Sequence, residues 1–309
     1  MAEEPAPAAQ VRLPATPRLT PNAAIPETPP VVFALPDLPP VFEAKAVDLY
    51  CSGFITTRAI SSDLNVLAKF PVSESVIATE GNYIYLSRGA NSGIATGDLF
   101  TAVRSTRKIN STRESVGELG LHYLEVGQMR AVMVQPEFSM ARVLHSFDGI
   151  EVGDLTVAFN EIAFPKLPSD RPFDSMMPGN GKTTGAIAMA RGTLSNSGSS
   201  LFGETTVVPG VAGDRLGGIA GGVASEGQVV YIDLGDQDGI QTGDLFLIYR
   251  LLDTNSPLHP LSKEAVRLIG GQRQVVGELV VLKVEEQAAA ALVAFTSGGV
   301  FSGDSIELR

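Results

Sequence analysis

The segment whose residue types most suggest chemistry is Gly-Asn-Gly-Lys-Thr-Thr at 179–184. It matches the end of a phosphate-binding loop, in which backbone amides surround a phosphate, Lys neutralises its charge and Ser or Thr holds magnesium. That loop needs its first glycine at position 176, which is Met176 here, and Pro178 removes an amide donor. The residues that follow predict a strand where the loop requires a helix. We therefore interpret Lys182 as part of a linker.

Metal-ligating and nucleophilic residues are sparse. His122, His145 and His259 show no H-x-x-x-H spacing. The single cysteine, Cys51, lies in an apolar, strand-like segment, which favours a buried thiol over a nucleophile. No G-x-S-x-G or S-x-x-K pattern with partners occurs. The sequence thus predicts no catalytic residue, no metal ligand and no cofactor site, and so a protein that is not an enzyme.

Two further groups leave alternatives open. Asp233, Asp236 and Asp238 cluster in a turn that suggests calcium binding or acid/base work, but their spacing departs from the EF-hand pattern, so an exposed turn is favoured. Tyr83 and Tyr85 either pack on a sheet face or stack on a sugar. Packing is likewise the default for the tyrosines in the other strand segments: Tyr123, Tyr231 and Tyr249.

Length and charge limit the classes of function. The chain has 309 residues, 44% of them hydrophobic, which suffices for two ordinary domains. Its formal net charge of −11 repels phosphate backbones and anionic lipids, so nucleic-acid binding is not expected. No apolar run reaches the roughly 18 residues of a membrane-spanning helix. The acidic, Pro/Ala-rich start lacks the pattern of a secretory signal, and we expect no export signal in it.

Composition divides the chain into parts. Eleven of the 20 prolines fall in residues 1–40, which predicts a Pro-rich, disordered arm over 1–46. Short apolar stretches broken by Gly, Asn, Asp and Ser then predict a mostly β protein with two small barrels or sandwiches in tandem. The expected boundaries are 47–160 for the first β domain, 161–183 for a linker and 184–309 for the second β domain.

The expected strands of the first domain are 46–56, 83–88, 98–104, 127–135, 139–147 and 154–159. A short helix is predicted around Ser62–Lys69. In the second domain, the strand over 185–194 is expected to take the place that 48–56 takes in the first.

An internal duplication is the strongest signal in the sequence. Residues 78–100 align without a gap on 224–246, at an offset of 146. Two later blocks, 127–135 with 277–285 and 149–157 with 299–307, align at an offset of 150. Three ordered blocks of this kind indicate one unit present twice, with four extra residues in an intervening loop of the second copy.

Each unit contains a Gly-Asp pair twice, before a strand. Glycine supplies a positive φ, and Asp accepts a hydrogen bond from the backbone just ahead of it, so we interpret these residues as structural turns. The turn residues are Gly97, Asp98, Gly153, Asp154, Gly243, Asp244, Gly303 and Asp304.

The repeated pattern, G-[IV]-x-x-G-D-x-[FL] followed by a glycine-led strand pair and a second Gly-Asp, resembles the C-terminal domain of flagellar assembly protein T. It is also similar to a domain of the type IV pilus secretin-associated proteins, where a peptidoglycan-binding LysM module precedes it. The resemblance covers 80–159 and 226–309. The matching residues are Gly89, Gly93, Ile94, Gly97, Asp98, Phe100, Gly127, Gly153 and Asp154, and Gly235, Gly239, Ile240, Gly243, Asp244, Phe246, Gly277, Gly303 and Asp304.

The resemblance implies a non-enzymatic scaffold or assembly factor of the cell envelope, periplasmic or associated with the outer membrane. Its implied partner is a secretin or a flagellar ring component. This chain shows no LysM module, so the resemblance does not carry peptidoglycan binding over to it. The alternative hypothesis is a cell-wall or carbohydrate-binding module.

Overall fold

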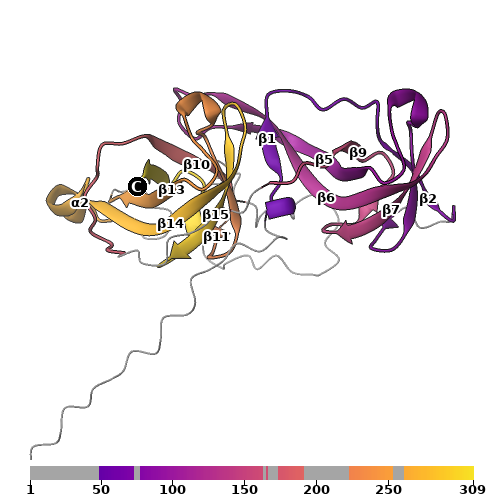
Figure 1. The fold of residues 1–309 in the computed structure, drawn as a ribbon. Coiled ribbons are helices and arrows are strands. Elements are labelled where there is room, and N and C mark those ends of the chain that lie inside the picture. Colours follow the sequence, from indigo (N-terminus) through magenta and orange to yellow (C-terminus); the bar gives the residue numbers. More distant parts are fainter. Residues whose placement is uncertain (1–48, 73–76, 163–164, 166–172, 191–222, 253–260) are drawn as a thin grey trace, which may run out of the picture. The chain divides into compact units, whose positions relative to one another are not determined.

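The computed structural model describes residues 49–72, 77–162, 165, 173–190, 223–252 and 261–309 (Figure 1). The predicted Pro-rich arm, and with it the predicted disorder, lies outside the described residues, as does much of the predicted linker. Pro40–Arg309 forms one compact unit. Within the described ranges, no helix has the length and apolar character needed to cross a bilayer.

The first repeat is a seven-stranded antiparallel sheet in the order β2-β4-β7-β6-β5-β9, with β1 paired to β6. Its two border strands, β2 and β9, meet at one end. There Val66 N–H donates to the backbone oxygen of Asp154 at 2.9 Å, and Gly153 N–H donates to the backbone oxygen of Val66 at 2.8 Å. The sheet strands are β1 Phe54–Thr56, β2 Val66–Phe70, β4 Tyr83–Leu86, β5 Leu99–Asn110, β6 Glu118–Val134, β7 Ser139–Ser146 and β9 Leu155–Ala158. A separate short pair is β3 Ile77–Ala78 with β8 Ile150–Glu151, and η1 spans Ala90–Ser92.

The second repeat is a closed barrel in the order β10-β12-β15-β14-β13-β17, a closure that removes the exposed strand edges of a sheet. Its strands are β10 Thr184–Ala190, β12 Val229–Ile232, β13 Leu245–Leu251, β14 Arg273–Val284, β15 Ala289–Thr296 and β17 Ser305–Leu308. The remaining elements are the pair β11 Val223–Ala224 and β16 Val300–Phe301, η3 Asp236–Asp238 and helix α2 Lys263–Ile269. The predicted fold class, mostly β with tandem small β domains, is confirmed.

The six strands of the barrel match the six strands β2, β4, β5, β6, β7 and β9 of the first repeat, and this match corrects one detail of the sequence analysis. Strand β10 pairs with β12 as β2 pairs with β4, and both pairings shift register at the same point. The counterpart of β10 is therefore β2, and none of the described strands of the second repeat corresponds to β1. The helix predicted over Ser62–Lys69 is also wrong, since Val66–Phe70 is strand β2; a short apolar run alone does not distinguish helix from strand.

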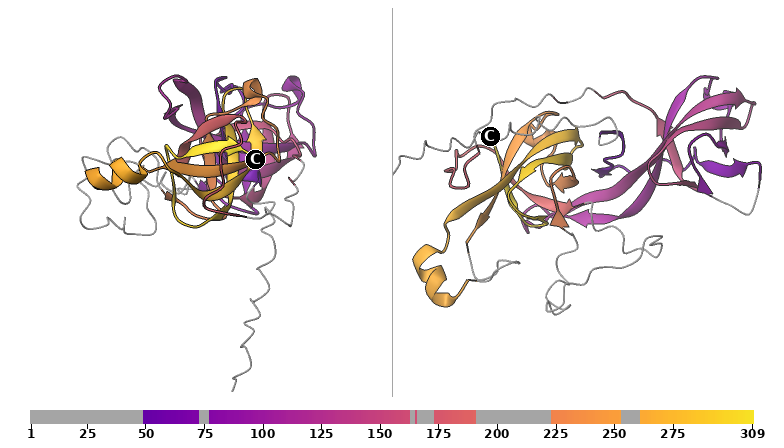
Figure 2. Two further views of the ribbon diagram at one scale, coloured as in Figure 1. Left: turned by 90° about the vertical axis from the view of Figure 1, so that its left-hand side faces the viewer. Right: turned by 90° about the horizontal axis from the view of Figure 1, so that it is seen from below.

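Three buried clusters form the core. One fills the first repeat and one the second. The third, here called the inter-repeat cluster, joins them, and Figure 2 shows the magenta strands of the first repeat beside the orange and yellow strands of the second. From the first repeat it contains Leu49, Ile55, Ile109 and Leu119. From the second it contains Ala188, Met189, Val229, Tyr231, Val280, Leu282, Ala288, Ala290 and Leu292.

Candidate functional site

The four Gly-Asp turns share one geometry. Their glycines have positive φ values of 101°, 94°, 94° and 93°, in the left-handed region that favours glycine, at Gly97, Gly153, Gly243 and Gly303. Each following aspartate accepts a hydrogen bond, of 2.7–2.8 Å, from the backbone N–H three residues earlier. These aspartates are Asp98, Asp154, Asp244 and Asp304.

The second turn of each repeat also binds an arginine that the sequence analysis missed. Arg104 Nε and Nη2 each lie 2.8 Å from the Asp154 carboxylate, and Arg250 makes the same bidentate contact with Asp304 at 2.5 and 2.6 Å. Both aspartates are 5% exposed. The hydrogen bond to Asp154 raises the pKa of Arg104 above its ordinary value. The two arginines stand 146 residues apart, which is the offset of the first repeated block. This recurrence is the feature of the sequence that could have identified them.

A buried ion pair lies between the repeats. Lys283 Nζ of β14 lies 2.5 Å from Glu125 Oε2 of β6, and the two side chains are 9% and 11% exposed. The same carboxylate accepts a hydrogen bond from Gly53 N–H at 3.1 Å. Burial lowers the pKa of Lys283, against the opposing effect of Glu125. Both charges are thus satisfied inside the protein, which suits a structural contact between the repeats.

The predicted exposed aspartate turn is only partly exposed. Asp236 and Asp238 are exposed, but Asp233 is buried and lies 2.6 Å from Arg113 Nε of the first repeat. It also accepts hydrogen bonds from the Ser111 hydroxyl and from Ala186 N–H. Asp233 is buried because the β5–β6 hairpin of the first repeat covers it. Among the residues described, no three His, Cys, Asp or Glu side chains gather as a metal would require.

The lysine of the loop at 179–184 contacts the end of the chain. Lys182 Nζ donates to the Arg309 backbone oxygen at 2.7 Å. The amides of Asn180 and Gly181 both donate to Glu307 Oε1 at 3.0 Å, so a carboxylate of this chain occupies the position that a phosphate would take. The loop at 179–184 is therefore hydrogen-bonded to β17 and to the residue that follows it.

The other sequence candidates are dispersed. His122 is buried beside Tyr231, with ring centroids 4.7 Å apart, whereas His145 is exposed on β7. His259 lies outside the described residues. Cys51 is half-buried and forms no disulfide.

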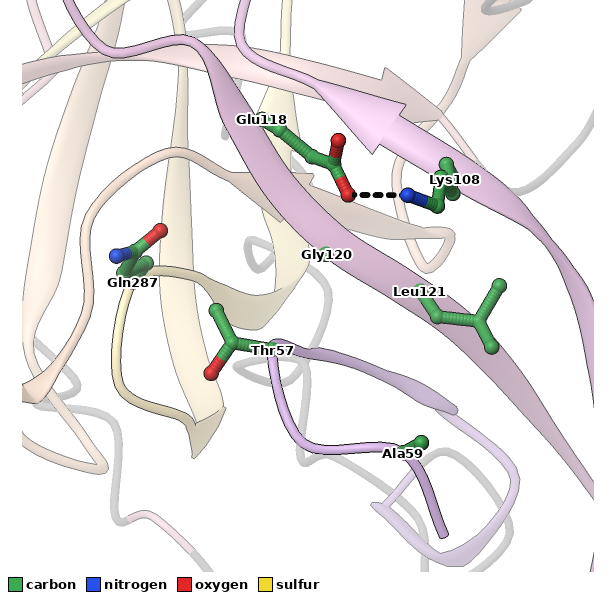
Figure 3. A pocket seen from close by; sticks show the side chains of 7 residues that line it. All are labelled: Thr57, Ala59, Lys108, Glu118, Gly120, Leu121 and Gln287. Atoms are coloured by element: carbon green, nitrogen blue, oxygen red, sulfur yellow. Dashed lines mark ion pairs between the residues drawn. The ribbon is translucent and has the colours of Figure 1, made fainter.

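Figure 3 shows a pocket of about 360 Å³ at the junction of the repeats. Its charged lining residues, Lys108 and Glu118, form an ion pair of 3.0 Å in which both side chains are more than half exposed. The pocket is lined by Thr57, Ala59, Lys108, Glu118, Gly120, Leu121 and Gln287. The hydroxyl of the lining residue Thr57 donates a hydrogen bond to Glu286 at 2.8 Å.

The strongest candidate for function is an uncovered face on the first repeat, here called the outer face. Tyr83 on β4 pairs with Phe70 on β2 and with Arg142 on β7, and side chains of such partners share one side of a sheet. Tyr85 lies between two aromatic rings, 6.1 Å from Phe70 and 6.0 Å from Phe138 between centroids. The apolar members are Leu67, Phe70, Tyr83, Tyr85, Val132, Phe138 and Met140.

Four large apolar side chains of the outer face are exposed to solvent. Exposure is 49% for Leu67, 44% for Phe70, 37% for Tyr83 and 36% for Phe138. Contiguous exposed apolar surface marks a site of interaction. Arg130 and Arg142 are cross-strand partners, so the face also carries positive charge in a chain that is acidic overall.

The same face of the second repeat is covered. Tyr231 stands in β12 where Tyr85 stands in β4, and it is fully buried. Its hydroxyl donates to the backbone oxygen of Ser52 at 2.5 Å. The residues that cover it are those that the first repeat contributes to the inter-repeat cluster. Among the described residues, this face of the repeated unit is thus packed against the first repeat in the second copy and exposed in the first copy.

Comparison with known protein families finds no family that matches the chain, and no curated protein matches it either.

Proposed function

We propose that this protein is a non-enzymatic assembly factor of the cell envelope, acting through protein–protein contacts at a pilus secretin or a flagellar ring. The observation that carries the proposal is the outer face of the first repeat, whose counterpart in the second repeat packs against the first repeat of the same chain. The residues at its centre are Tyr83, Tyr85 and Phe138. The envelope setting is what the resemblance of the repeated Gly-Asp pattern to the flagellar and pilus domains implies.

The ionisable side chains support a scaffold. The buried charges described above neutralise one another: Glu125 binds Lys283, Asp233 binds Arg113 and Asp304 binds Arg250. Breaking such a buried pair is costly, so its groups are held in place, whereas a catalytic group must stay available to a substrate. Among the described residues, the exposed aromatic and aliphatic side chains of the outer face form a surface suited to a protein partner.

A carbohydrate-binding module is the second candidate. The exposed ring of Tyr83 beside Tyr85, with Arg142 opposite, is an arrangement on which a sugar ring could stack. Wall binding predicts that the purified protein sediments with peptidoglycan and that Tyr83→Ala abolishes this. Assembly predicts no sedimentation with peptidoglycan.

The test of the proposed function is cross-linking in cells that express the protein from its own locus, followed by envelope fractionation and mass spectrometry. Capture of a secretin or flagellar ring component in the outer-membrane fraction is the expected result. Recovery of the protein alone from the cytosol would overturn the proposal, and recovery of peptidoglycan fragments alone would favour wall binding.

A further inference from the structure

The two repeats present the same backbone at the outer face. The bulge between Val66 and Ala68 in β2 recurs between Ile187 and Met189 in β10. Tyr83 and Tyr85 correspond to Val229 and Tyr231 at the offset of 146. A protein segment that packs on the outer face of one repeat therefore meets the same strand geometry on the outer face of the other repeat.

In the second repeat, the occupant of this face is known in detail. The long β5–β6 hairpin of the first repeat reaches it and inserts Ile109 and Leu119, while β1 adds Ile55. Val229 is 5% exposed and Tyr231 is 0% exposed as a result. The unit thus binds a following copy of itself through the end of its β5–β6 hairpin.

The second repeat has the corresponding end, formed by β13, β14 and the helix α2 between them, and Figure 1 shows α2 beyond the barrel strands. Three apolar side chains are exposed there. Leu251 at the end of β13 is 54% exposed, and Leu268 and Ile269 of α2 are 67% and 44% exposed. Ile269 stands at the position of Leu119, at the offset of 150, and Leu119 is one of the side chains that bury the outer face of the second repeat.

We infer that the outer face of the first repeat binds the β13–β14 end of a second copy of this chain. Copies then associate head to tail, through the end of the second repeat that corresponds to the β5–β6 hairpin end of the first. Such a contact uses two different surfaces, so it leaves one of each free and extends into a ring or a filament. The inference rests on the proposed function as an assembly factor, and it identifies the protein that the outer face contacts as a second copy of this chain.

The test is sedimentation velocity of the full chain from about 1 to about 200 µM. Salt at about 0.3 M screens the repulsion between copies that each carry a charge of −11. We expect species that grow past the dimer with concentration. Tyr83→Glu on the outer face and Leu268→Glu on α2 each reduce the association constant about 30-fold or more, as a charge placed at the centre of an apolar contact does.

The control is Val152→Glu, because Val152 is exposed to 48% in the turn before β9 and belongs to neither surface. It is expected to associate like the unaltered protein. Unchanged circular dichroism in all three variants establishes that they are folded.

A mixture of the Tyr83→Glu and Leu268→Glu variants gives the decisive result. One has an intact β13–β14 end and the other an intact outer face, so together they form dimers that grow no further. A mixture that stays monomeric overturns the inference, as does an unaltered protein that is monomeric throughout. Association with no envelope component captured in cells leaves the inference standing and removes the proposed function, so the two failures are distinguishable.

Discussion

The Tyr231 hydroxyl donates a hydrogen bond of 2.5 Å to the backbone oxygen of Ser52, which lies 179 positions earlier in the chain. Both groups are buried, and the bond joins the second repeat to the segment that precedes β1. The contact shows why the repeats form one unit, since the second repeat buries its outer face by means of the first.

Replacing Tyr231 with Phe removes this bond and leaves the Ser52 oxygen buried without that donor. We expect the free energy of unfolding to fall by about 1–3 kcal/mol, measured by urea denaturation. The matched control is Tyr83→Phe, because Tyr83 is 37% exposed and the same loss of a hydroxyl there takes place at the surface. Equal effects of the two changes would contradict the importance of the Ser52 contact.

The Lys283–Glu125 pair gives a prediction about buried charge. Lys283→Met leaves the Glu125 carboxylate buried without its cation, which we expect to cost about 3–5 kcal/mol of unfolding free energy. Adding Glu125→Gln removes the stranded charge and keeps an acceptor for Gly53 N–H, so the double variant recovers much of the loss. The exposed Lys108–Glu118 pair is the control, and Lys108→Met there costs less than about 1 kcal/mol. A double variant no more stable than Lys283→Met would refute this reading.

The pKa of Glu285 predicts a dependence of stability on pH. Burial raises the pKa of this carboxyl and Glu286 adds to the rise, while Thr56, Lys283 and Arg58 oppose it. Because the folded state then holds its proton more strongly, the contribution of Glu285 is most favourable below its ordinary pKa of 4.5 and is lost as pH rises through the folded value. Glu285→Gln, which cannot ionise, therefore gains stability relative to the unaltered protein between pH 4 and pH 7. Urea midpoints measured across that range test this, and a constant difference would count against it.

The bidentate contact between Arg250 and Asp304 requires a guanidinium. Lysine keeps the charge but cannot reach both carboxylate oxygens and the Gly299 carbonyl together, so Arg250→Lys is expected to cost about 1–3 kcal/mol. Arg142→Lys on the exposed side of β7 is the control and should change stability by less than about 0.5 kcal/mol. Thermal unfolding of both variants tests the difference.

Replacing a glycine of the Gly-Asp turns is expected to lower the free energy of unfolding through backbone conformation alone. A Cβ added at Gly97 meets no atom within 4 Å, but the φ of +101° is one that side chains rarely adopt. We expect Gly97→Ala to cost about 1–2 kcal/mol. Gly298→Ala is the matched control, since its Cβ also meets nothing and its φ lies outside the left-handed region. If both variants unfold at the same urea concentration, the turn does not need glycine.

The sequence by itself determined the repeated architecture, because glycine conformation and strand alternation are local. The blocks at 78–100 and 224–246 predicted two equivalent β units, and the Gly-Asp spacing predicted where their turns lie. The recurrence of Arg104 at Arg250 was available in the same alignment and points to the buried Arg-Asp pairs. The strand β2 was missed because a short apolar run has no period of its own, and only its pairing with β4 defines it.

Only the tertiary structure decided which outer face is covered. Tyr85 and Tyr231 stand in aligned segments, yet one is half-exposed and the other fully buried. The difference comes from Ile55, Ile109 and Leu119, which lie more than a hundred positions from Tyr231 in the chain. Burial depends on which distant side chains exclude water from a surface, and no local pattern of residues encodes that.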